Sequence, residues 1–221
     1  MTGMPTHTWA TLLVCVVAAL MVSPLLAGWT VGLSPGKPAA TAPWWHPRRV
    51  GAHRLVIVAG VAAVLAAGGT RGDPLPAWWL FAVGGAVLCV IDVQHHLLPA
   101  RILYPLAATV LTALAGTAAV TGEPDRLLRA ILAAAVVGGG WFAVAFLVPS
   151  AMGLGDVRVA ALTAGLLGWI GWSAVLTGQL SALALAVVTA GIIAATGHVG
   201  RGVQVPMGPA LIAGALAVTW L

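Results

Sequence analysis

Long apolar stretches, separated by short polar loops, constrain the fold of this chain more than any other feature. A transmembrane helix needs about 20 consecutive apolar residues, so a chain of 221 residues has room for seven or eight crossings and little else. Apolar runs predict helices at 8–28, 54–69, 77–94, 102–120, 127–149, 158–172, 174–196 and 206–221. We therefore expect an all-α fold, a polytopic transmembrane helix bundle of about eight spans.

The composition excludes several other classes of protein. Apolar residues make up 61% of the chain and charged residues 7%, whereas soluble domains have about 45–50% and about 25%. A water-soluble core of this size cannot bury so much apolar surface, which excludes a soluble enzyme, a disordered chain and a disulfide scaffold. The net charge of +5 comes from 10 basic and 5 acidic residues, too few for a nucleic-acid-binding face.

The basic residues predict how the helices are oriented, because cytoplasmic loops carry an excess of Lys and Arg. Strict alternation of the spans places seven basic residues on one side and three on the other. We expect the larger group to be cytoplasmic and both termini to lie outside. The larger group is Lys37, Arg48, Arg49, Arg54, Arg101, Arg158 and Arg201, and the smaller is Arg71, Arg126 and Arg129.

Residues 29–53 form the longest polar segment, which is rich in Pro, Gly and Trp. The segment is too short to fold as a separate domain, and it contains no cysteine, which excludes a zinc site of paired cysteines there. No basic residue precedes the first apolar run, so we expect an uncleaved span rather than a signal peptide. The chain divides into an N-terminal span with its cytoplasmic linker, 1–53, and a membrane-embedded unit, 54–221.

Two of the five acidic residues lie at the ends of apolar runs. Asp92 ends the run GGAVLCVID, and Asp156 lies between FLVPSAMGLG and VRVAALTAGLLGW. An Asp at the bilayer centre costs about 2.5–3.5 kcal/mol, and an acid within the membrane indicates a functional site. Two predicted spans separate these residues, and two crossings return the chain to the same face. We therefore expect both carboxylates on one side, which the loop charges make cytoplasmic.

Structural roles are alternatives for both carboxylates. Asp156 precedes a predicted helix, where a carboxylate accepts the first free N–H groups as an N-cap. Asp92 lies near a helix C-terminus, where a negative charge is unfavourable, and an ion pair with Arg101 would compensate it.

Two carboxylates that meet in a low-dielectric site can hold a single proton between them, because both cannot easily be charged. The charged member takes a proton from a water molecule, and the protonated member donates to the carbonyl oxygen of a scissile amide. This chemistry needs neither a covalent intermediate nor a metal. Gly153 and Gly155 fit such a site, because glycine lets another chain approach closely; an ordinary loop turn is the alternative.

Three segments carry a recognisable pattern: IDVQHHLLP at 91–99, MGLGDVR at 152–158 and VPMGPALIAGAL at 205–216. In this order they resemble the first aspartate motif, the Gly-x-Gly-Asp motif and the last-helix Pro-Phe-Gly-Pro segment of prepilin peptidases. This family, also called type IV leader peptidases, belongs to the intramembrane aspartic proteases. The resemblance covers roughly 54–221.

The resemblance implies an aspartic endopeptidase of the bacterial cytoplasmic membrane. Such enzymes remove the short basic leader from type IV pilin-like precursors at the cytoplasmic face. They cut after a Gly, just before the hydrophobic stem of the precursor. It assigns Asp92 and Asp156 as the catalytic pair, Gly153, Gly155 and Arg158 as the active-site loop, and Pro99, Pro206 and Gly208 as the lining of a substrate channel. It implies no cofactor, and it names precursor substrates and the lipid bilayer as partners, with no nucleic acid.

Several positions depart from the family pattern. Arg158 replaces the usual Lys, Met207 the usual Phe, and Ala100 the usual Asp or Asn. The Arg keeps the charge but changes its geometry. Bifunctional members carry Cys-x-x-Cys pairs after the first span, and their absence from 29–53 puts the second activity, N-methylation, in doubt.

Two other functions use the same features. A proton- or cation-coupled transporter would use the two acids as an ion site, although the chain lacks paired broken helices in two matching halves. A non-catalytic assembly protein with the same fold is a third possibility. His95 and His96 follow Asp92 at metal-ligand spacing, but no second ligand cluster accompanies them, which favours interfacial or loop histidines. The tryptophans near predicted interfaces are interpreted as belt residues: Trp44, Trp45, Trp78, Trp79, Trp169 and Trp172.

Overall fold

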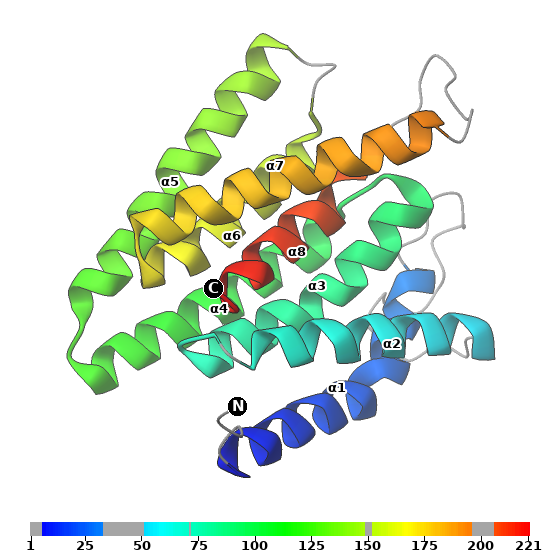
Figure 1. The fold of residues 1–221 in the computed structure, drawn as a ribbon, viewed down its shortest axis with the longest axis horizontal. Coiled ribbons are helices and arrows are strands. Elements are labelled where there is room, and N and C mark those ends of the chain that lie inside the picture. Colours follow the sequence, from blue (N-terminus) through cyan, green and yellow to red (C-terminus); the bar gives the residue numbers. More distant parts are fainter. Residues whose placement is uncertain (1–5, 33–50, 71, 149–151, 196–205) are drawn as a thin grey trace.

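A computed structural model shows a bundle of helices (Figure 1). The structure describes residues 6–32, 51–70, 72–148, 152–195 and 206–221, and these ranges contain eight α-helices and no strand. The helices are α1 (Thr6–Gly32), α2 (Ala52–Gly69), α3 (Leu75–His95), α4 (Ala100–Thr121), α5 (Pro124–Leu147), α6 (Leu154–Ile170), α7 (Trp172–Ala195) and α8 (Met207–Val218). The predicted all-α bundle is confirmed, and each helix begins and ends within four residues of its predicted span.

Five of the described helices are long and apolar enough to cross a membrane, namely α1, α3, α4, α5 and α7. The apolar helices α2 and α8 are shorter. The 12 residues of α8 rise about 18 Å, against a hydrocarbon core about 30 Å thick. Because α8 packs against α3, α6 and α7, its short length is accommodated inside the bundle. The protein is a multi-pass membrane protein.

A central position in the bundle belongs to α3, which packs against α1, α2, α4 and α8 (Figure 1). Most of α3 is buried, whereas α5 and α7 expose most of their length. Its fully buried side chains include Trp78, Phe81, Leu88 and Ile91, which share one core with Ile212 of α8. The apolar residues that make α3 a membrane span therefore also place Asp92, at the start of its last turn, in the interior.

The turn between α4 and α5 shows why these helices end where they do. Gly122 has a φ of 71°, a left-handed conformation that glycine adopts without steric cost. The carbonyl of Ala118 accepts the N–H groups of Gly122 at 2.9 Å and of Glu123 at 3.1 Å, a pattern that closes a helix C-terminus. Pro124 then begins α5, since the first turn of a helix needs no N–H from it. The short turn makes the two helices antiparallel neighbours.

A proline inside α1 is accommodated locally. Pro24 has no N–H, so it leaves the carbonyl of Leu20 without its helical donor. The hydroxyl of Ser23 donates to that carbonyl at 2.7 Å, which restores a hydrogen bond that the lipid would not supply. The indole N–H of Trp79 in α3 donates to the carbonyl of Cys15 at 3.0 Å and ties α1 to the centre of the bundle.

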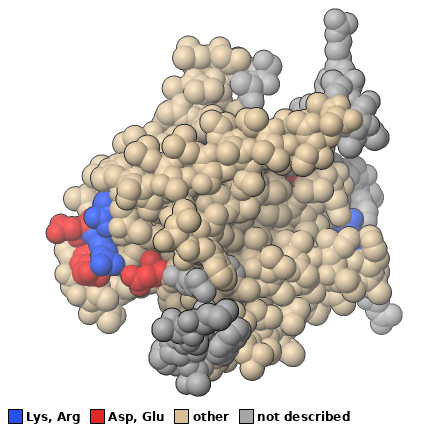
Figure 2. Space-filling model, viewed as in Figure 1, with Lys and Arg blue, Asp and Glu red and all other residues tan. Residues whose placement is uncertain are grey.

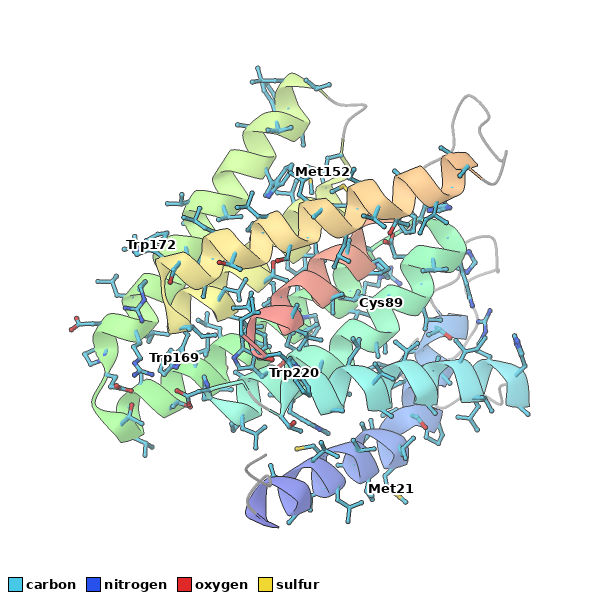
Figure 3. The ribbon with its side chains drawn as sticks, viewed as in Figure 1. Met21, Cys89, Met152, Trp169, Trp172 and Trp220 are labelled. Atoms are coloured by element: carbon cyan, nitrogen blue, oxygen red, sulfur yellow. The ribbon has the colours of Figure 1, made fainter. Side chains whose placement is uncertain are left out.

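The belt interpretation is wrong for two of the tryptophans. Trp78 is 0% exposed and Trp169 is 1% exposed, so both rings pack inside the bundle. The Trp78 ring meets Phe81 edge-on with 6.2 Å between centroids, and its N–H donates to the carbonyl of Asp73 at 3.3 Å. Trp172, at the start of α7 (Figure 3), is 47% exposed. Trp79 is half-buried, and Trp44 and Trp45 lie outside the described residues.

Charged side chains gather at one end of the molecule, around the α4–α5 turn (Figure 2). Arg126 pairs with Asp73 at 3.2 Å and with Glu123 at 3.1 Å. Arg129 donates to the carbonyls of Gly168 at 2.7 Å and Trp169 at 2.8 Å, which satisfies carbonyls that the end of α6 leaves free. These contacts join the α2–α3 loop, the α4–α5 turn and the end of α6.

The described basic residues separate as the orientation prediction requires. Arg126 and Arg129 lie at the end just described, whereas Arg101 and Arg158 lie at the other ends of α4 and α6. Arg54 donates to the side-chain oxygen of Gln94 at 3.1 Å, so it lies beside the end of α3 that carries Asp92. The rest of the prediction lies outside the described residues: Lys37, Arg48, Arg49, Arg71 and Arg201, with most of the linker 29–53.

Candidate functional site

Three segments that are distant in sequence meet at one end of the bundle. They are the C-terminal turn of α3, the N-terminal turn of α6 and the N-terminus of α8. α8 packs against both α3 and α6, which brings the three motifs of the sequence together. Gly208, whose N–H contacts Asp92, and Gly155, next to Asp156, both lie against Leu98, so the two carboxylates lie at the same end of the bundle, as the parity argument predicts.

Asp92 is held by the start of a different helix. The residue is 4% exposed, and its Oδ2 accepts the N–H of Gly208 at 2.9 Å. Gly208 is the second residue of α8, where the free amides and the helix dipole favour a negative charge. Both Asp92 and Arg101 are described by the structure, and it shows no ion pair between them. The α8 N-terminus therefore supplies the compensation that the ion-pair alternative assigned to Arg101.

Asp156 is held by its own helix. It lies in the first turn of α6, and its Oδ2 accepts the N–H of Gly153 at 3.2 Å. A side chain in the first turn that reaches back to the residue preceding the helix satisfies one of its free amides. Asp156 therefore caps the helix, but from a position inside the first turn rather than from the residue that precedes the helix. The hydrogen bond from Gly153 uses only one of the two carboxylate oxygens of Asp156.

Both carboxylates share one arrangement. A backbone amide of a glycine holds Oδ2, and no hydrogen bond from the described residues reaches Oδ1 of either side chain. Within the described residues, each acid therefore has one oxygen fixed by a glycine amide and a second oxygen to which no other residue donates. Such a pair can bind a water molecule and exchange protons with it.

Leu98 fills the space between the three segments and is 9% exposed. A Cβ atom added to Gly155 would lie 2.7 Å from the Leu98 Cβ. One added to Gly208 would lie 3.2 Å from the Leu98 Cδ2 and 2.8 Å from the Asp92 Oδ2. Gly155 and Gly208 are therefore needed for close approach. The role of Leu98 was not predicted from the sequence, in which the Leu-Pro pair before α4 is the available signal.

The remaining predicted positions lie around this centre. Pro99 directly precedes α4, and Pro206 directly precedes α8. Their role in a substrate channel, and that of Gly208, stays a prediction. The guanidinium of Arg158 lies over the ring of Tyr104, 5.4 Å from its centroid, within the range of a cation–π interaction.

A small apolar cluster packs at the N-terminal turn of α6, which carries Asp156. Gly155 and Arg158 also belong to this helix, so only Gly153 lies in the predicted active-site loop. Met152 packs with Ala145 of α5 and Val157 of α6, and Met207 of α8 contacts the same cluster. Figure 3 shows Met152 beside the start of α6, far from Trp169 at the other end of the helix. Met207 thus keeps an apolar side chain where Phe is usual, and a flexible thioether fills such a gap well.

The two histidines lie beside this centre. His95 is half-buried and its Nε2 has no hydrogen-bond partner among the described residues. His96 is exposed, ends α3 with a φ of 49° and donates its N–H to the carbonyl of Asp92 at 2.7 Å. Within the described ranges, no three His, Cys, Asp or Glu side chains gather as metal ligands would.

The sequence of this chain is similar to one family of known proteins. The sequence model of the type IV leader peptidase family matches residues 77–197, which is more than half of the chain. The match runs from the first turn of α3 past the end of α7, and it includes both Asp92 and Asp156. No curated protein and no solved structure shows a significant match.

Proposed function

The chain belongs to the type IV leader peptidase family, and from this premise we propose that it is an aspartic endopeptidase with Asp92 and Asp156 as its catalytic pair. The substrates proposed are type IV pilin-like precursors, whose basic leader is removed at the cytoplasmic face of the bacterial membrane. The peptidase unit is 54–221. The observation that supports this proposal most is the arrangement of the two acids, each with one oxygen fixed and one available.

The proposed reaction uses a single proton shared by the pair. A water molecule lies between the two Oδ1 atoms, and the charged carboxylate takes its proton as the water oxygen attacks the scissile carbonyl carbon. The protonated carboxyl donates its proton to the carbonyl oxygen, which forms a neutral tetrahedral intermediate. The new carboxyl then gives its proton to the amide nitrogen as the C–N bond breaks. The other carboxylate takes the proton of one hydroxyl of the intermediate, which yields the carboxylic acid, the free amine and the singly protonated pair.

The glycine amides have a defined role in this reaction. The N–H groups of Gly208 and Gly153 stabilise negative charge on Oδ2 of Asp92 and Asp156, respectively. They also hold each carboxylate in one orientation, so the attacking water and the carbonyl oxygen meet groups that need not reorganise. The proton belongs to the pair, and neither residue is assigned permanently as acid or base.

The positions of three Arg residues concern the orientation of the site, and the family match concerns the transporter alternative. Arg54, Arg101 and Arg158 lie at the same end of the bundle as the two acids, which supports a cytoplasmic site. The family match is to peptidases, which disfavours the transporter.

The proposal is tested by replacing each acid with its amide. We expect Asp92→Asn and Asp156→Asn each to slow cleavage by about 10²–10⁴-fold, the usual contribution of a positioned acid or base. Asn keeps the size of Asp and an oxygen for the glycine N–H, so the fold should be retained. The measurement is the initial cleavage rate of a synthetic precursor by the purified protein, followed by mass spectrometry.

Asp73→Asn is the matched control, because this exposed residue lies at the opposite end of the bundle in a surface ion pair. Such pairs contribute about 0–1 kcal/mol to stability, so this variant should cleave at the wild-type rate. The catalytic assignment is wrong if either Asn variant at the proposed pair retains more than a tenth of that rate.

A further inference from the structure

We propose that a groove between α4, α5 and α6 binds the hydrophobic stem of the precursor beside the two acids. The groove is an apolar cavity of about 340 Å³ lined by residues within 103–114 of α4, 130–134 of α5 and 158–166 of α6. The identity of the stem rests on the proposed function. The binding of an apolar helix in this groove is supported by the location, direction, lining and charge of the groove.

The groove begins at the level of the two acids along the bundle, on a different face of α6 from Asp156, and extends away from that end. Arg158, two residues after Asp156, lines one end, and Leu114 and Leu166 line it further along α4 and α6. From 103 to 114, α4 rises about 16 Å, close to half of a hydrocarbon core about 30 Å thick. An apolar segment that leaves the two acids along this groove therefore passes through one leaflet.

The lining suits a helix better than a lipid chain. Arg158 is the one charged residue in it, and five of its residues are small: Ala107, Ala130, Ala134, Ala161 and Gly165. Small residues let two helices approach closely in a membrane, whereas a flexible lipid chain needs no such surface. The cavity takes the side chains of one face of a helix and leaves the opposite face in contact with lipid.

The charge at the mouth selects which part of the precursor enters. Arg158 lies over Tyr104 and forms no ion pair with an acid among the described residues. A basic leader is repelled by this cation, since like charges brought together are costly. The uncharged stem pays no such electrostatic penalty. The leader therefore lies on the other side of the two acids, which places the scissile bond between leader and stem beside them.

The first test fills the groove from α4. Ala107→Trp places a large ring among the lining residues, whereas Ala108→Trp, one residue along α4, places it at an exposed position outside the lining. Two substrates are compared. The long substrate is a synthetic precursor with a Leu/Ala stem of about 20 residues, enough to span the membrane. The short substrate is a soluble version truncated shortly after the cleavage position. We expect Ala107→Trp to raise KM at least about tenfold (RT ln 10 of lost binding) for the long substrate only, with kcat within twofold of Ala108→Trp. Equal kinetics of the two variants on the long substrate would overturn the proposal.

The second test does not depend on cleavage. Ala107→Cys and Ala108→Cys are each combined with Asp92→Asn and oxidised with precursors that carry one Cys in the stem; both native cysteines, Cys15 and Cys89, are buried. We expect a disulfide with the stem at position 107 at least ten times more abundant than at 108. No preference for 107, as a lipid-filled groove would give, contradicts the proposal. Cross-linking at 107 by a protein whose wild type cuts nothing would retain the groove and reject the peptidase assignment.

Discussion

At the scale of single residues, Gly208 and Gly153 position the two acids through their backbone N–H groups. Sequence patterns singled out Asp92 and Asp156 as candidates because acids are rare in this chain, Asp92 ends an apolar run, and Asp156 lies between two such runs. The patterns did not identify the amide donors. The donor to Asp92 is 116 residues away in the sequence, and no local spacing relates the two. Gly208, which the sequence analysis assigned only to a channel, contacts the Asp92 carboxylate directly.

The Gly208→Ala substitution tests this positioning role. Its Cβ would lie 2.8 Å from the Asp92 Oδ2 and 3.2 Å from the Leu98 Cδ2, and both atoms are ends of side chains that can rotate away at little cost to the fold. A displacement of about 1 Å can cost about 10²-fold in rate. We expect kcat to fall by about 10–10²-fold while the free energy of unfolding stays within about 1 kcal/mol of wild type.

Gly116→Ala is the control for Gly208→Ala, because a Cβ added there meets nothing within 4 Å. Both variants are assayed for cleavage and for unfolding in detergent. A Gly208→Ala protein with wild-type kcat would show that the contact between α8 and Asp92 does not position the carboxylate.

At the scale of helices, glycines and alanines set how closely α5 and α6 pack. A Cβ added to Gly168 of α6 would lie 2.6 Å from the Ala133 Cβ and 3.0 Å from the Ala130 Cα. One added to Gly138 of α5 would lie 2.9 Å from the Ala161 Cβ. Close backbone approach through small residues is a main source of helix association in membranes. The sequence analysis predicted both helices and their ends, but the composition of a span does not state which neighbour it contacts.

Gly168→Ala is expected to destabilise the pair by about 1–3 kcal/mol, because the new methyl group meets backbone atoms that cannot rotate away. Gly139→Ala, in α5 itself, meets nothing within 4 Å and should leave stability unchanged or slightly higher, since Ala favours helix over Gly. Unfolding of both purified variants by SDS titration measures the difference. Equal stability of the two proteins would argue against close packing at Gly168.

At the scale of the whole molecule, the two ends of the bundle differ in their charged residues, and only one of them holds the candidate site. One end holds the ion pairs of Arg126 with Asp73 and Glu123 (Figure 2). The other holds the two acids of the candidate site, with Arg101 and Arg158 at the starts of α4 and α6. Among the described residues, three Arg lie at this second end, where Arg54 joins Arg101 and Arg158, and two lie at the first, and this difference is the physical basis for the proposed cytoplasmic orientation.

Cysteine labelling in intact cells tests the orientation. Asp125→Cys lies at the end with the ion pairs and Arg101→Cys at the end with the acids, both at exposed positions. A membrane-impermeant maleimide should label position 125 in intact cells and position 101 only after permeabilisation. The native cysteines are buried and give a low background. Labelling of 101 but not 125 in intact cells would place the candidate site outside.

The sequence by itself determined the helices and the shared side of the two acids. A backbone inside a membrane must satisfy its own hydrogen bonds, so the length of an apolar run is enough to predict a helix, and two crossings return the chain to its starting face. The tertiary structure alone decided that Leu98 packs between Gly155 and Gly208, that α8 holds Asp92, and that the rings of Trp78 and Trp169 face inward. These features depend on which helix surfaces fit together. The periodic pattern of residues within one span does not state which residue, a hundred positions away, will contact it.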